Sequence, residues 1–349
     1  MAFRSRPGQI DLLEYLIGLY TPEIRDAFLL AIQDIVDEAI LAEVIRAIEN
    51  GEPDKAFEVL GFNQAAMKPL LDAIERSFER GGIMTGENFP KYLRTPSGRA
   101  VFRFDMRNSR AEAWLRDKSS MLVRQLSDDA RENVRTTLYH GMTEGRNPRS
   151  VALDIVGRVD TQSRKRVGGV IGLTTQQESW VSSARRYLNT LDERYFAMKL
   201  RDKRFDRIVQ RSISLGTPLP KDTIDKLVIA YRNNALRYRG EMIGRTEAIQ
   251  ALNRAQFEAH LQAVDMGALR VQDIVRVWDS AGDNRVRWSH KRLDEQKRIG
   301  LDDAFESPSG ARMMFPGDTS LGAPASEVIA CRCRVRLEVD FLAQWEDDD

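Results

Sequence analysis

Apolar residues recur at the spacing of an amphipathic helix over most of this chain, and that periodicity limits the possible folds more than any other feature. The pattern is clear over residues 10–49, 108–142 and 222–238. Thr174 precedes Gln177 by three residues, which is the spacing of a helix capping box. Glycine and proline interrupt the pattern, most clearly at 216–220. We therefore expect a series of long helices in the first two thirds of the chain.

Three helix ends are predicted from proline or glycine. Pro22 after Thr21 predicts a helix start. The pair Gly81 and Gly82 predicts a helix end, because glycine is the preferred residue just past a helix. Gly240 predicts a break between one helix over 222–238 and another over 241–264.

After residue 264 the pattern changes to short extended segments. β-Branched residues are frequent over 271–278, and 328–341 alternates, with apolar side chains and both cysteines on one face and charged side chains on the other. The fold class expected is α+β, with a mostly helical N-terminal two thirds followed by a small α+β C-terminal domain with an antiparallel sheet. We divide the chain into an acidic helical region (1–98), a basic helical region (99–240) and the α+β domain (241–349).

The net charge is close to zero, but the charge is unevenly distributed. The chain of 349 residues has 53 Lys+Arg and 52 Asp+Glu. Residues 4–58 contain five basic and twelve acidic residues, whereas 140–240 contain twenty basic and ten acidic residues. Charge runs of this kind are more often solvated helix faces than polyanion sites. The basic residues that could contact a polyanion are Arg164, Lys165, Arg166, Arg185, Arg186, Arg201, Lys203 and Arg204.

Neither a membrane span nor a disulfide framework is expected. No apolar stretch approaches the length of about 18 residues that a span needs, and residues 1–9 show no secretory signal. The chain has only two cysteines, Cys331 and Cys333, which fits a reducing compartment.

Two cysteines and one histidine form a candidate metal site. Thiols at positions i and i+2 of a strand project from one face, and His290 lies on the apolar side of a short expected helix, so His290, Cys331 and Cys333 could converge on zinc. A structural zinc usually has four ligands, and Asp283 would be an unusual fourth. The alternative is that the two cysteines only fill a buried strand face, and the sequence favours that interpretation. We therefore expect no cofactor, with zinc as the one metal hypothesis.

A second group contains acids, bases and a cation that could serve hydrolysis or group transfer. The sequence has no phosphate-binding glycine loop, nucleophile elbow or HExxH pair, so it identifies no reaction and we expect no enzyme. Surface pairing is the alternative, for example between Glu241 and Arg245 one helical turn apart. The group comprises Arg245, Thr246, Glu247, Asp283, His290, Asp294 and Glu295.

Several of these residues belong to an ordered set of segments, which are RTEAIQALN (245–253), VWDSAGDNR (277–285), SHKRLD (289–294), Phe305, PGD (316–318) and GAPASEVIACRC (322–333). The set closely resembles the C-terminal domain of the Mu F-like head-morphogenesis proteins of tailed phages. It covers about the last 110 residues, and the preceding helices, including 168–174, look similar to the helical region that often precedes that domain. The motif positions are Arg245, Thr246, Glu247, Asp283, His290, Leu293, Asp294, Cys331 and Cys333.

Two positions depart from the family pattern. Glu295 stands where many relatives have Gly after the Leu-Asp pair, and Ala330 stands where Asn commonly precedes Cys-Arg-Cys. Both departures weaken the idea of an intact active site without weakening the expected fold.

The resemblance implies a minor capsid protein of the virion that associates with the portal during procapsid assembly. It implies a place in the head interior or at the portal vertex, with the host cytoplasm as the site of assembly and no membrane involved at that stage. The scaffold protein or the major capsid protein is a further expected partner. Double-stranded DNA, bound without sequence specificity, is another, and the protein could be ejected together with the packaged DNA. The alternatives are an enzyme or toxin-like activity in the C-terminal domain, and a non-specific DNA-binding internal virion protein.

Overall fold

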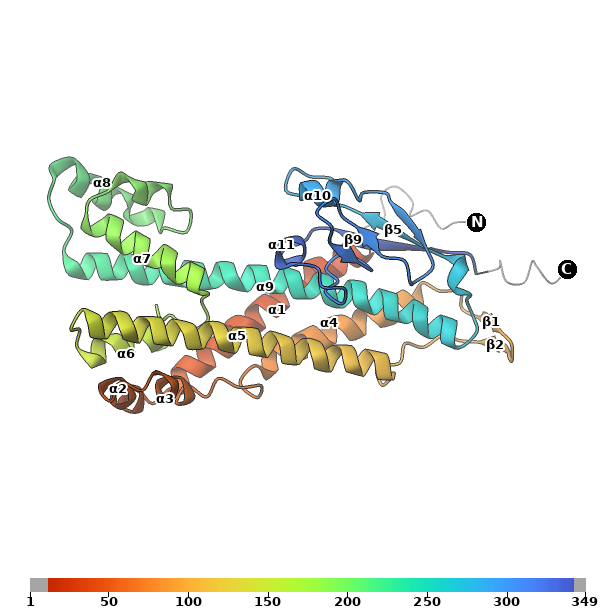
Figure 1. Ribbon diagram of the computed structural model, residues 1–349, viewed down its shortest axis with the longest axis horizontal. Coiled ribbons are helices and arrows are strands. Elements are labelled where there is room, and N and C mark those ends of the chain that lie inside the picture. Colours follow the sequence, from red (N-terminus) through yellow and green to blue (C-terminus); the bar gives the residue numbers. More distant parts are fainter. Residues whose placement is uncertain (1–11, 342–349) are drawn as a thin grey trace. The chain divides into compact units, whose positions relative to one another are not determined.

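The computed structural model describes residues 12–341, which form two compact units (Figure 1). Among the described residues, the first unit combines 12–26, 70–118 and 241–341, and the second combines 27–69 and 119–240. Four helices contribute residues to both units: α1 (Leu12–Glu38), α4 (Lys68–Glu87), α5 (Ser109–Thr143) and α9 (Lys221–Asp265). The sequence interpretation divides the chain into three contiguous regions, whereas these units are assembled from separate stretches. The boundary after residue 240 is common to both divisions.

The second unit is almost entirely helical. One apolar cluster lies between α7, α8 and the first part of α9, and it contains Leu188, Tyr195, Leu227 and Tyr231. The Thr174–Gln177 capping box is confirmed, with each side chain bonded to the other residue's backbone N–H. Besides its parts of α1, α4, α5 and α9, the unit contains α2 (Leu41–Glu49), α3 (Pro53–Glu58), α6 (Pro148–Val156), β3 (Arg158–Val159), β4 (Arg166–Val167), α7 (Thr175–Asn189), α8 (Asp206–Leu215) and the 3₁₀ turns Glu193–Ala197 and Lys203–Phe205.

The first unit contains a small antiparallel sheet beside the second part of α9. Strand β5 (Ile274–Asp279) is central, between β6 (Lys297–Ile299) and β9 (Arg334–Val339), and Figure 1 shows α10 and α11 beside this sheet. The α+β class with long helices is therefore confirmed. The remaining elements are α4 (Lys68–Glu87), β1 (Leu93–Thr95), β2 (Gly98–Ala100), the 3₁₀ turn Val271–Asp273, α10 (Trp288–Lys291), β7 (Phe305–Glu306), β8 (Arg312–Met313) and α11 (Ala325–Val328).

The helix ends predicted from proline and glycine are wrong at three places. Pro22 lies inside α1, α4 continues through Gly81 and Gly82, and α9 continues through Gly240 as one helix of 45 residues. Close packing explains the glycine at position 82, because a Cβ atom there would lie 2.3 Å from the Phe104 ring. These glycines therefore do not end their helices.

The last strand begins later than the alternation of residues 328–341 predicts. The chain forms α11 and then a turn in which Ala330 has φ +53°, and β9 begins only at Arg334. A strand cannot include a left-handed residue without losing its pleat, so residues 328–333 are outside the sheet.

No helix within residues 12–341 is both long and apolar enough to span a membrane.

Candidate metal centre and its polar surroundings

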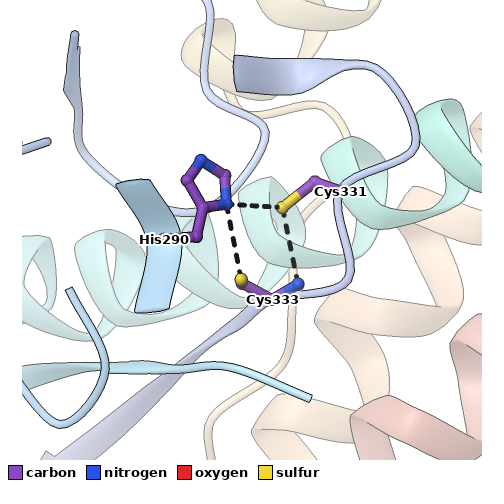
Figure 2. Close-up of side chains that lie close together, drawn as sticks. All are labelled: His290, Cys331 and Cys333. Carbon is purple, nitrogen blue, oxygen red and sulfur yellow. Dashed lines mark hydrogen bonds between the residues drawn. The ribbon is translucent and has the colours of Figure 1, made fainter. Parts of the chain in front are cut away.

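His290, Cys331 and Cys333 converge in the interior of the first unit (Figure 2). His290 comes from α10, and the cysteines come from the turn between α11 and β9. The Nδ1 atom of His290 lies 3.4 Å from the Sγ atom of each cysteine. The three side chains are 1%, 0% and 1% exposed. The expected convergence is confirmed, although the cysteines project from a turn and not from a strand.

An apolar cluster surrounds these side chains. Trp278 of β5 is fully buried, and its ring meets the His290 ring edge to face at 5.1 Å. Val286 and Leu293, on either side of α10, pack into the same cluster, as do Phe305 and Met313 from the β7–β8 hairpin. The cysteines thus fill part of a core, as the packing interpretation requires, but they do so with both sulfur atoms facing one imidazole nitrogen.

The other ring nitrogen of His290 faces a carboxylate. Nε2 lies 2.8 Å from Oε2 of Glu327, the third residue of α11. The hydroxyl groups of Ser289 and Ser309 donate to the two oxygens of Glu327 at 2.8 and 2.7 Å. Burial alone would raise the pKa of Glu327, but these hydrogen bonds and the nearby His290 lower it. The two ring nitrogens of His290 therefore have different neighbours, a carboxylate at Nε2 and the two sulfur atoms at Nδ1.

The two thiols have opposite tendencies to ionise. A hydrogen bond from the Cys333 thiol, helped by His290 and opposed by burial, lowers the pKa of Cys331 well below its usual range. The same contact, together with burial, raises the pKa of Cys333. The Cys333 backbone N–H also donates to the Cys331 sulfur at 3.4 Å. Two negative charges in this buried space are unfavourable without a cation.

Asp283 does not join the three candidate ligands. Its carboxylate lies 2.7 Å from Arg332 and 3.7 Å from Arg285. A separate group of carboxylates, Asp279, Asp294 and Glu295, also clusters within 4.8 Å, but Asp279 pairs with an arginine and Asp294 accepts a backbone N–H. These carboxylates therefore already have partners in the protein.

The acid–base group predicted from the sequence is not assembled around one open site. Glu247 is buried and pairs with Lys118 at 2.9 Å. Glu295 pairs with Arg336 at 3.2 Å on the surface. Glu241 pairs with Arg25 at 2.7 Å, and not with Arg245 as the helical spacing suggested. Each acid thus has its own structural partner.

Arg245 lies beside two other arginines. Burial and the positive charges of Arg332 and Arg285 lower its pKa, whereas Glu241 and Asp283 oppose that effect. Among the residues that the structure describes, no carboxylate is within ion-pair distance of Arg245. This part of the first unit therefore carries excess positive charge, which suits contact with an anion.

The motif segment on α9 also contains two polar side chains that connect the helix to distant loops. Thr246 Oγ1 accepts the backbone N–H of Ala330 at 2.9 Å. Asn253, fully buried, donates to the carbonyl of Pro316 at 2.9 Å and accepts the N–H of Val335 at 3.0 Å. Sequence reasoning did not single out Asn253 or Glu327. The sequence does offer one signal for Asn253. It is a polar residue one turn after Ile249 on an apolar helix face, where a buried side chain needs hydrogen-bond partners.

Most of the candidate polyanion contacts in the second unit have local partners. Arg185, Arg201 and Arg204 pair with aspartates at 2.8, 3.0 and 2.6 Å. Arg164 and Lys165 are exposed in the β3–β4 hairpin. The others are Arg166, which donates to the carbonyl of Gly157, Arg186, which lies over the Tyr187 ring, and Lys203, which is exposed.

No protein-family model, curated protein or solved structure that was compared with the chain matches it.

Proposed function

We propose that this chain is a phage minor capsid protein for head morphogenesis, which associates with the portal during procapsid assembly. The observation that carries the proposal is the backbone at the two positions where the chain departs from the Mu F-like pattern. Glu295 has φ +59° and Ala330 has φ +53°, and both are therefore left-handed. Glycine and asparagine are the residues that best tolerate this conformation. These are also the residues that the family pattern has at the two positions.

The motif residues support the same proposal through their contacts. Thr246 and Asn253 connect α9 to the loops, Asp294 accepts the backbone N–H of Ser280 at 2.8 Å, and His290 faces both cysteines. The residues that carry the resemblance thus hold the domain together, which is what a shared structural domain requires. We propose no catalytic role, because these polar groups are committed to structural contacts.

Binding to the portal is the direct test. The full chain should co-sediment with the portal protein of its own phage at both low and high salt. It should not co-sediment with the portal protein of an unrelated phage. Salt-resistant association would support a specific protein interface. Absence of association at both salt concentrations would refute the proposal that the protein associates with the portal.

Non-specific DNA binding is a second candidate function, favoured by the excess positive charge at Arg245, Arg285 and Arg332 and by the exposed Arg164 and Lys165. Duplex DNA should therefore be a parallel ligand in the same experiment. Affinity that falls steeply with salt and ignores base sequence would support it. Salt-resistant portal binding without DNA binding would leave the assembly role alone.

Replacing Glu295 with glycine should raise the free energy of unfolding by about 0.5–1 kcal/mol, because the left-handed conformation costs a non-glycine residue about 1–2 kcal/mol. The exposed ion pair with Arg336 that this change removes contributes less than about 1 kcal/mol. Ala330→Asn should act in the same direction. Urea denaturation measures both effects.

Glu295→Gln is the matched control, since it removes the charge and keeps the strained backbone. It should leave stability within about 0.5 kcal/mol of the parent or lower it slightly. A destabilised Glu295→Gly variant would contradict the structural argument for the family pattern.

A further inference from the structure

We infer that His290, Cys331 and Cys333 bind one zinc ion, with water as the fourth ligand, and that this ion joins α10 to the turn before β9. The inference does not depend on the proposed role in head assembly. It rests on the position of three donor atoms, on the hydrogen-bond partners of the imidazole and on the chemistry of the donor set.

The donor atoms are spaced as in a tetrahedral zinc site. Zinc–sulfur and zinc–nitrogen bonds of about 2.3 and 2.0 Å at a tetrahedral angle place the sulfur and nitrogen ligands about 3.5 Å apart. The Nδ1 atom of His290 lies 3.4 Å from both sulfur atoms, and all three donor atoms lie within 4.8 Å of one another. A single imidazole lone pair can accept only one good S–H hydrogen bond. Two equal distances are explained better by a shared ion than by hydrogen bonding alone.

The second nitrogen of His290 has the partner that zinc-binding histidines usually have. A metal-bound imidazole almost always donates its other N–H to a carboxylate, carbonyl or water, which fixes the ring and its tautomer. Here Nε2 lies 2.8 Å from Glu327, and Ser289 and Ser309 hold that carboxylate in place. Glu327 thus orients Nδ1 toward the two sulfur atoms. Simple core packing does not require this buried carboxylate.

The donor set selects the metal. Thiolate and imidazole ligands suit zinc, whereas magnesium and calcium prefer oxygen ligands. Among residues 12–341, no other histidine, cysteine or carboxylate belongs to this group and could serve as the fourth ligand. A small ligand must therefore complete the tetrahedron. Because the three side chains are almost fully buried, the ion has a structural role and is not a site for a large substrate.

The ion would act as a crosslink between distant parts of the domain. It would join residue 290 to residues 331 and 333 in a domain that lacks disulfides among its described residues. It would also fix the backbone on both sides of Arg332, whose side chain meets Asp283 at 2.7 Å. The metal therefore positions one of the two arginines that pair with Asp283.

Metal content of the full chain is the primary test. The protein, purified without a histidine tag from zinc-supplemented cells, should contain one zinc per chain by mass spectrometry. Cys331→Ser and Cys333→Ser should each lose it. His140→Ala, which removes an exposed histidine of α5, is the matched control and should retain it. Zinc content that is unchanged in the cysteine variants, or parent protein without zinc, would overturn the inference.

Two further measurements separate metal binding from a folding defect in the cysteine variants. Glu327→Gln should still bind zinc, but about 10–100-fold more weakly in competition with a chelator. Cobalt(II) added to the zinc-depleted parent should give thiolate-to-cobalt charge-transfer absorption and the visible bands of a four-coordinate ion. Absence of these bands, or a disulfide between Cys331 and Cys333 in the parent, would refute the site.

Discussion

Replacing Asn253 with alanine should lower the free energy of unfolding by about 3 kcal/mol, because two buried backbone groups would lose their partner. The side chain of Asn253 is fully buried on α9. Its amide donates to the carbonyl of Pro316 and its oxygen accepts the N–H of Val335, the second residue of β9. Leaving a buried donor or acceptor without a partner costs about 1–3 kcal/mol for each group.

The measurement is urea denaturation followed by circular dichroism and by tryptophan fluorescence, since Trp278 lies in β5, paired with β9. Asn189→Ala, at the exposed end of α7, is the control and should change stability by less than about 0.5 kcal/mol. Equal stability of the two variants would show that α9 does not hold the loop and β9 through Asn253. Loss of the fluorescence signal before the helical signal would show that the sheet opens first.

The helical segments, although not all of their ends, could be predicted from the sequence because apolar periodicity records which face of each helix is buried. The helix predicted over 108–142 corresponds to α5, and the capping box at Thr174, which follows from local side-chain chemistry, is confirmed. The helix predicted over 241–264 ends within one residue of the end of α9 at Asp265, and Gly267 has φ +71° just beyond it. Local rules succeed where the residue acts on its own backbone.

The same rules fail where a residue is selected by a distant neighbour. Gly82 lies inside α4 because the Phe104 ring occupies the space of a side chain. The sequence does not reveal that contact, so a tight packing position was interpreted as a helix end. The start of β9 was misplaced for a related reason: alternation continues through 328–333, but left-handed Ala330 bends the chain there.

The candidate site could be predicted in part. Soft donor chemistry identified His290, Cys331 and Cys333, which the structure brings together. The contribution of Glu327 could not be predicted, since nothing in its local sequence distinguishes it from the many exposed glutamates. Its burial depends on the hydroxyl groups of Ser289 and Ser309, which are 38 and 18 residues away along the chain. Interactions over such separations require the fold itself.

Gly244 on α9 is the position where a contact distant in the sequence most clearly requires glycine. A Cβ atom at this position would lie 2.3 Å from the backbone oxygen of Thr21 and 3.1 Å from the backbone nitrogen of Arg25 in α1. Because backbone atoms cannot rotate away, Gly244→Ala must separate the two helices. We expect a loss of about 2–3 kcal/mol in the free energy of unfolding, after the gain of about 1 kcal/mol in helix propensity.

Gly18→Ala is the matched control on the other helix of this contact, since nothing lies within 4 Å of its added Cβ atom. Relief of the backbone entropy cost should raise stability there by about 0.5–1 kcal/mol. The same substitution should therefore have opposite signs at residues 18 and 244, measured by thermal and urea denaturation. A stabilising effect at both positions would contradict the close approach of α1 and α9, because propensity alone would then explain both results.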